Sequence, residues 1–226
     1  MNLVDARLSG ADLSGWQISD CNLLGANLSG ANLRGAHLQR VDLRLANLQG
    51  ACLEGARLEM VTATGAMLGG AQARHIRIHH VNLFEADLRG ADLSQAMLNA
   101  CTLEKANLDD CDLSGSYLVY STCVGAGFRH AQLEGLTALG STFREADFDG
   151  AMGFFRCNEI VAEVLLREAG DEHQRIMECA AIVADRERCY PEWKEYLADH
   201  ADAEAFAYRV FGHYPESGCT EALRDA

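Results

Sequence analysis

Large apolar residues recur at every fifth position along the first two thirds of the chain. The positions from Leu3 to Phe148 number thirty, and twenty-six of them hold Leu, Ile or Phe. A second series lies two residues earlier in each unit, with Ala at seventeen positions and Cys, Ser or Val at nine more. An α-helix repeats every 3.6 residues and a strand every 2, so neither keeps a period of five on one side of the chain. The pattern therefore predicts a chain that turns a corner every five residues and directs both series into a narrow core.

The individual units carry a recognisable consensus. They read "ADLSG", "ANLSG", "ANLRG", "ADLRG" and "ANLDD". The chain thus resembles the pentapeptide repeat family, whose unit is A(D/N)LXX. The resemblance implies that residues 1–152 form an all-β solenoid, a right-handed quadrilateral β-helix of about 7 to 8 coils, in which residues i and i+20 stack about 4.8 Å apart.

Departures from the repeat come with compensating changes nearby. Where the large inward residue shrinks to Ala, another inward residue in the same or the next unit grows. We therefore expect the inward volume to be roughly conserved, as close packing requires. The compensating sets are Val61 with Ala63, Leu136 with Ala138, and Ile76 and Ile78 with Ala73.

The two ends of the repeat differ. A solenoid buries each coil on its neighbours, so a terminal coil leaves apolar surface unless something covers it. The first units predict an open end, at which two molecules stack or a longer native chain continues. The candidate end-stacking residues are Leu3, Leu8, Leu13, Trp16 and Ile18.

Residues 153–226 predict a second, α-helical capping or interaction domain. "NEIVAEVLLREAG" offers Asn158 as an N-cap, a stripe of Ile160, Val164 and Leu165, and Gly170 as a stop. Further helical patterns follow over 171–187, 191–200 and 202–212, with a short one at 219–224. We expect aromatic residues of this domain to pack on the last coil and cap the rod.

Composition narrows the functional classes. The formal net charge is -14 and the pI about 4.9, which disfavours general affinity for nucleic acid. Nine cysteines without a secretion signal or an apolar membrane span predict reduced thiols in a cytoplasmic protein with no membrane partner. Cys21, Cys101, Cys111 and Cys123 fall on inward positions and are interpreted as small apolar residues, whereas Cys52 is predicted to face outward.

Motifs that support catalysis are missing from the sequence. It contains no GxGxxG, GxxxxGK(S/T), HExxH, GxSxG or CxxC motif. In "DEHQR", His173 and Glu178 are five residues apart and do not share a helical face. We therefore expect no enzyme, and assign no catalytic, cofactor-binding or metal-binding residue.

Residues 73–80, "ARHIRIHH", suggest a metal site at first sight. The repeat register directs Ala73, Ile76 and Ile78 inward and the remaining five side chains outward. His75 then lies near an earlier corner than His79 and His80, so the three do not converge on one ion. The stretch instead lies at the centre of a basic patch, whose members are Arg34, His37, Arg40, Arg57, Arg74, His75, Arg77, His79 and His80, opposed by Glu54 and Glu59.

An acidic patch is expected on other faces, one to two coils later. Its members are Glu85, Asp87, Asp92, Glu104, Asp109, Asp110 and Asp112.

These features favour a non-catalytic protein–protein interaction scaffold with an unidentified protein partner, and a homodimer formed through the N-terminal coil or the helical domain. One alternative follows from the resemblance: some family members protect DNA gyrase by mimicking DNA, which the rod and the negative charge favour and the arginine cluster disfavours. Nucleic-acid binding through the arginines ranks lower, because no interleaved aromatic residues accompany them. The remaining alternative is that both patches only keep the rod soluble.

Overall fold

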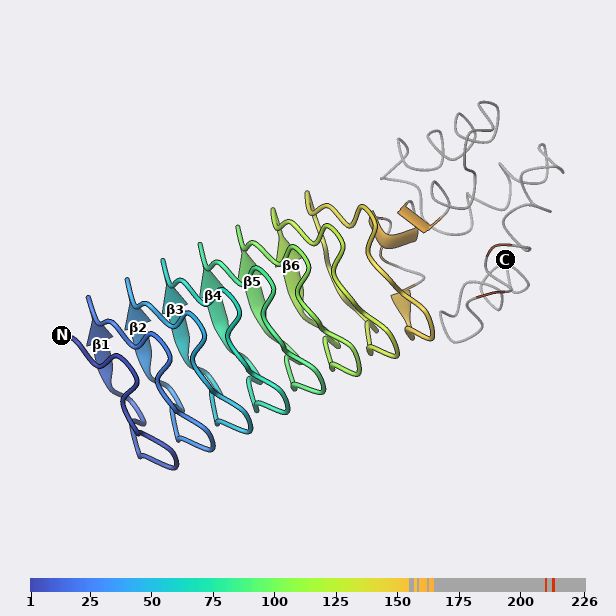
Figure 1. Cartoon of the computed structure of the whole chain (residues 1–226). Coiled ribbons are helices and arrows are strands. Elements are labelled where there is room, and N and C mark those ends of the chain that lie inside the picture. Colours follow the sequence, from blue (N-terminus) through green and yellow to red (C-terminus); the bar gives the residue numbers. More distant parts are fainter. Residues whose placement is uncertain (155–156, 158, 162, 165–209, 211–212, 214–226) are drawn as a thin grey trace, which may run out of the picture.

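The computed structural model describes residues 1–154, 157, 159–161, 163–164, 210 and 213. Residues 1–152 form a straight rod of stacked coils (Figure 1). One side of the rod is a six-stranded parallel sheet in the order β1-β2-β3-β4-β5-β6. The strands are β1 (Gln17–Ser19), β2 (His37–Gln39), β3 (Arg57–Glu59), β4 (Arg77–His79), β5 (Met97–Asn99) and β6 (Tyr117–Val119). Each strand pairs with the residues twenty positions later, so the stacking period expected from the sequence is correct.

Three further columns of parallel bridges complete the four sides of each coil. They begin with the pairs Asn2↔Asn22, Arg7↔Asn27 and Asp12↔Asn32 and run up to Gln132↔Met152. The strands mark five full turns between β1 and β6, fewer than the 7 to 8 coils expected. After β6 this side continues through the single bridge Tyr117↔Thr137, because at Ala138 the chain forms a hydrogen-bonded turn, Ser141 N–H to Ala138 O at 3.0 Å, instead of a strand.

The corners explain the five-residue unit. At most of them an N–H closes a turn on the carbonyl three residues earlier, as Ala6 does on Leu3 at 3.1 Å. The fifth residue of every unit from Asp5 to Gly150 has a positive φ, as the third residue of a type II turn requires. Half of these thirty residues are Gly, and the other half adopt the left-handed conformation despite a Cβ atom.

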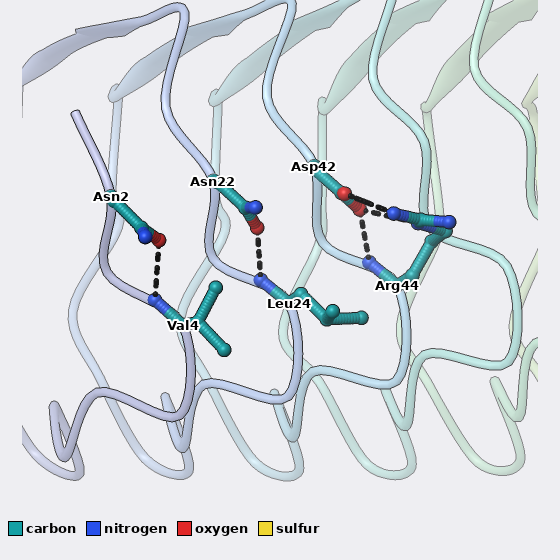
Figure 2. A network of polar contacts seen from close by, with 6 residues as sticks. All are labelled: Asn2, Val4, Asn22, Leu24, Asp42 and Arg44. Atoms are coloured by element: carbon teal, nitrogen blue, oxygen red, sulfur yellow. Dashed lines mark hydrogen bonds and ion pairs between the residues drawn. The ribbon is translucent and has the colours of Figure 1, made fainter.

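Polar residues on one side support the corners through their own backbone. Figure 2 shows the side-chain oxygens of Asn2, Asn22 and Asp42 accepting the N–H two residues ahead, at 3.3, 3.0 and 3.1 Å. These are Asx turns, which pre-form the bend that follows. Asp42 also holds the guanidinium of Arg44 at 2.7 Å, and this hydrogen bond holds the pKa of Asp42 below its usual range. These side chains therefore stabilise the bends of the coils to which they belong.

The core follows the predicted register. Ala73, Ile76 and Ile78 are buried, and Cys21, Cys101, Cys111 and Cys123 point inward as expected, while Cys52 is half-buried. The expectation of conserved volume is wrong in one region. An apolar cavity of about 20 Å³ is lined by Ala63, Ala71 and Ala73 together with leucines of neighbouring coils, because Val61, Ile76 and Ile78 do not fill the space left by the missing leucines.

The two ends of the rod differ in burial. At the N-terminal end Trp16, in the first coil, is 55% exposed, whereas Ala36 at the same position of the next coil is fully buried. Leu3, Leu8 and Ile18 are half-buried there, whereas Leu13 is buried, and the predicted stacking through this end stays a prediction.

At the other end four phenylalanines pack together. Phe148 lies 5.1 Å from Phe128, 5.8 Å from Phe143 and 5.9 Å from Phe154, measured between ring centroids. Ile160 and Val164, two residues of the predicted stripe, are helical and fully buried in the same core.

The backbone edge of the last coil is also covered. In the coil before, the N–H of Gly125 donates to the carbonyl of Arg144 at 2.8 Å. Twenty residues later the N–H of Glu145 donates instead to the carboxylate of Glu163, at 3.1 Å. A side chain thus takes the place of the next coil's carbonyl, which satisfies a donor at the edge of the ladder. Farther along the helical domain predicted over 153–226, the structure describes Val210, which is helical and buried, and His213, which is exposed in a turn. Leu165 and the rest of the predicted later helices lie outside the described residues.

Candidate protein-interaction face

The strands of the sheet present one flat side of the rod, which we call the β1–β6 face. It consists of the outward residues of the six strands and the residue after each strand. Because successive coils stack in register, these residues form three straight columns. The first column runs Gln17, His37, Arg57, Arg77, Met97 and Tyr117; the second Ser19, Gln39, Glu59, His79, Asn99 and Val119; the third Asp20, Arg40, Met60, His80, Ala100 and Tyr120.

The predicted basic patch divides between this face and the corner before it. His37, Arg57, Arg77 and His79 lie on the strands, and Arg40 and His80 follow them. The structure places Arg34, Arg74 and His75 at the preceding corner, which β2 and β4 follow. In the part of the chain that the structure describes, no three His, Cys, Asp or Glu side chains are arranged to hold a metal ion.

Several of the patch's charges are compensated within the rod. Arg34 pairs with Glu54 at 3.1 Å. Arg40 makes two hydrogen bonds to Asp20, each 2.7 Å long, which hold the pKa of Asp20 below its usual range. Asp20 is an acid that the sequence interpretation did not count among the opposing residues, although the twenty-residue stacking places it next to Arg40 in the same column.

Two arginines on the face stand side by side without an acid. Arg57 and Arg77 are direct partners on β3 and β4, so their backbones are about 4.8 Å apart. Both side chains are exposed, and neither has a hydrogen bond or an ion pair among the described residues. Glu59, the nearest acid along β3, is engaged instead with His37 at 3.5 Å and with Gln39 at 3.3 Å. Two like charges therefore remain opposed on neighbouring strands, which is unfavourable for the fold.

The other half of the face is apolar, and the sequence interpretation missed it. Met97 and Tyr117 are each about half exposed and Tyr120 is 65% exposed, and Leu139 in the next coil beyond β6 is also about half exposed. The ring of Tyr120 lies over Gly140, where an added Cβ would come within 2.6 Å of it. These residues lie twenty or so positions apart in the sequence, so reading the columns for apolar residues as well as for charges would have found them.

The predicted acidic residues lie on the second and third bridge columns and the corners beside them, away from the β1–β6 face. Most are used locally: Asp87 binds Arg89 at 2.7 Å, Asp92 and Asp112 accept N–H groups of Ser94 and Ser114, and Asp109 accepts the N–H of Arg129. The hydrogen bond from Arg89 holds the pKa of Asp87 below its usual range. Among the described residues the carboxylates of Glu85, Glu104 and Asp110 have no such partner.

Four buried thiols have pKa values that keep them protonated at neutral pH. Burial raises the pKa of the Cys101 thiol to about 11 and those of Cys111 and Cys157 to about 12. The pKa of Cys123 is raised as well, also by burial. Because the thiolate is the reactive form, these side chains behave as small apolar residues.

We expect iodoacetamide at pH 8 to modify Cys52 at least about tenfold faster than Cys101 or Cys111, since a thiol with a pKa of about 11 is only about 0.1% thiolate at that pH. Brief alkylation followed by peptide mass spectrometry measures each site separately. In urea all of these sites should react at similar rates. Equal labelling of Cys101 and Cys52 in the native protein would contradict the buried placement.

Comparisons with known proteins agree with this architecture. The profile of pentapeptide repeats matches residues 21–59 and 76–115 in eight copies. HetL, a pentapeptide repeat protein from the cyanobacterium Nostoc that is involved in heterocyst differentiation regulation, is 31% identical; the match covers 67% of this chain and 74% of HetL, with a TM-score of 0.33. The chain belongs to the pentapeptide repeat family.

Another solved structure shows the same fold at lower identity. QnrB1, a plasmid-mediated fluoroquinolone resistance protein, superposes with a TM-score of 0.51 at 21% identity, over 64% of this chain and 78% of that one. No curated protein sequence is a significant match. In the described part of this pentapeptide repeat protein, no helix has the length and apolar character needed to cross a membrane.

Proposed function

We propose that this pentapeptide repeat protein is a non-catalytic rod that binds protein partners through its side faces. The β1–β6 face supports this proposal most directly. It is flat, it is built on the one side of the rod with continuous strands, and it exposes two tyrosines and two methionines beside arginines. Tyr, Met and Arg are the residues enriched in protein interfaces, and Tyr and Arg supply many of the residues that dominate binding energy.

The interior of the rod supports the same proposal. Both inward series are packed, and the cavity around Ala63 and Ala73 holds about 20 Å³, far less than the several hundred Å³ of a typical small-molecule site. Its lining is apolar, so it offers no group for acid–base or nucleophilic chemistry. The surface, not the interior, is then the part of the rod available for function.

DNA mimicry directed at gyrase is a weaker candidate. Residues 1–150 carry seventeen Asp and Glu against eleven Lys and Arg, which is compatible with an acidic surface. However, Asp20, Asp42 and Asp87 are already paired with arginines, and Arg57, Arg74 and Arg77 present uncompensated positive charge. The described side faces therefore do not present a continuous negative surface like that of DNA.

Site-specific photo-crosslinking in the native cell tests the proposal. A photoreactive amino acid replaces Met97 on the β1–β6 face, Met67 on the opposite side or Gln72 on the side between them, in the full chain. We expect a defined protein adduct from at least one position, and none from the same positions after the chain is heat-denatured in extract. A chain that crosslinks to no protein from any of the three positions would contradict the proposal. Purified gyrase supercoiling assays with micromolar protein check the weaker candidate separately.

A further inference from the structure

The β1–β6 face combines two surfaces that are usually separate. Its central strands carry the opposed guanidinium groups of Arg57 and Arg77. The next strands continue the same column with Met97 and Tyr117. The column thus changes from cationic to apolar over four coils, without any change in backbone shape.

The arginine pair is poorly explained by stability. Two like charges on directly opposed strand positions repel, and an acid at either position would relieve that repulsion. Elsewhere in the rod an acid does stand next to an arginine in the stack. Arg40 forms an ion pair with Asp20, and Arg34 forms one with Glu54, each pair twenty residues apart. At Arg57 and Arg77 no such acid is supplied among the described residues, which leaves both guanidinium groups free to bind a carboxylate from outside.

The net charge of the face also differs from that of the rod. With histidines neutral, it carries Arg40, Arg57 and Arg77 against Asp20 and Glu59, a formal charge of +1, within a rod whose acids outnumber its bases. An acidic partner is therefore attracted to this face, and to the corner before it that carries Arg74, more than to the acidic remainder of the rod.

The apolar half of the face sets a second requirement for the chemistry of the partner. Tyr117 and Tyr120 expose rigid rings whose hydroxyls have no partner among the described residues, and Met97 and Leu139 flank them. Such a cluster contributes to affinity when apolar side chains of a partner cover it and water is excluded. A partner with only acidic residues would leave this surface exposed to water.

We propose that the β1–β6 face binds an acidic protein segment that carries apolar side chains. Its carboxylates pair with Arg57 and Arg77, and its apolar residues cover Met97, Tyr117 and Tyr120. This inference rests on the proposed function, since it names the face used and the chemistry of the partner.

A random twelve-residue peptide library displayed on phage and selected on the purified full chain tests the inference. We expect the selected peptides to be enriched in both Asp or Glu and large apolar residues. Their affinities, measured by fluorescence anisotropy, should fall as salt concentration rises, because the arginines are exposed. Selection of lysine-rich or purely apolar peptides, or of none, would overturn the inference.

One substitution separates folding from binding. Arg77→Glu places an acid opposite Arg57, so the thermal midpoint should stay unchanged or rise, while the affinity for the acidic peptides should fall at least about tenfold. Arg7→Glu makes the same change of charge at an exposed position on the opposite side and should leave binding within about twofold. Equal losses in both variants, or no loss in Arg77→Glu, would count against the face.

Methyl NMR with labelled methionine locates the peptide independently. Met60 and Met97 lie on the face, whereas Met67 lies on the opposite side and provides an internal control. Shifts at Met60 and Met97 alone are the expected result, and shifts at Met67 alone would overturn the inference. If sedimentation instead shows a dimer that Tyr117→Ser dissociates, the face is occupied by a second copy and the inference is wrong. A cellular partner that Arg77→Glu does not release would leave the proposed function intact while overturning this assignment of the face.

Discussion

Replacing Phe148 by alanine is expected to lower the free energy of unfolding by about 3–5 kcal/mol. The ring is fully buried and stacks on Phe128, with an interplanar angle of 11°, between Phe143 and Phe154. Truncation removes the contacts of all three neighbours at once, because the stack joins the last coils to the residues that cover them. Urea denaturation followed by circular dichroism measures the change.

The location of the damage is as informative as its size. In a solenoid each coil contacts only its neighbours, so the loss should begin at the last coils and spread inward. Amide hydrogen exchange should accelerate first over residues 123–152, with little change near β1. Leu139→Ala, at a side chain that is half exposed, serves as the control and should cost less than about 1 kcal/mol. A uniform loss of protection along the rod would contradict a stack that acts at its end.

The second large effect is expected at Gly153, where the repeat ends. Its φ is +74°, and a Cβ atom there would lie 2.9 Å from the backbone nitrogen of Glu134 and 3.0 Å from its Cα. Gly153→Ala therefore combines left-handed strain with a backbone clash that no side-chain rotation relieves. We expect it to destabilise the protein by about 2–4 kcal/mol.

Gly50→Ala provides a matched comparison for that variant. Gly50 has a similar φ of +64°, but an added Cβ would meet nothing within 4 Å. Only the conformational penalty remains, so the expected cost is about 1 kcal/mol. Chemical denaturation of both variants measures the difference. Similar costs in the two would show that the backbone near Glu134 can move aside.

The sequence predicts the rod well because each inward residue is selected by the same local rule. The register alone places Ile76 and Ile78 inside and Arg77 outside, and the structure agrees. What the register cannot provide is the reach of long side chains across coils. The pairing of Arg40 with Asp20, and the absence of any comparable acid for Arg57, depend on side-chain direction in the stack.

Two other features of the structure could not be predicted from the sequence pattern. The apolar cavity beside Ala63 and Ala73 depends on how side chains pack between coils, which the count of large and small residues does not give. In the C-terminal segment the predicted N-terminal turn is helical at 159–161, 163 and 164. How later helices would assemble depends on contacts that amphipathic patterns leave open.

The unbroken twenty-residue stacking has a consequence for how such a protein can change in evolution. A coil can be gained or lost as a whole while every column stays in phase. Removal of a single five-residue unit between β4 and β5, for example residues 81–85, would instead rotate all later residues by a quarter turn. Met97 and Tyr117 would then leave the side that carries Arg57 and Arg77. A deletion of five residues would therefore place the arginine surface and the apolar surface on adjacent sides of the rod, at right angles to each other.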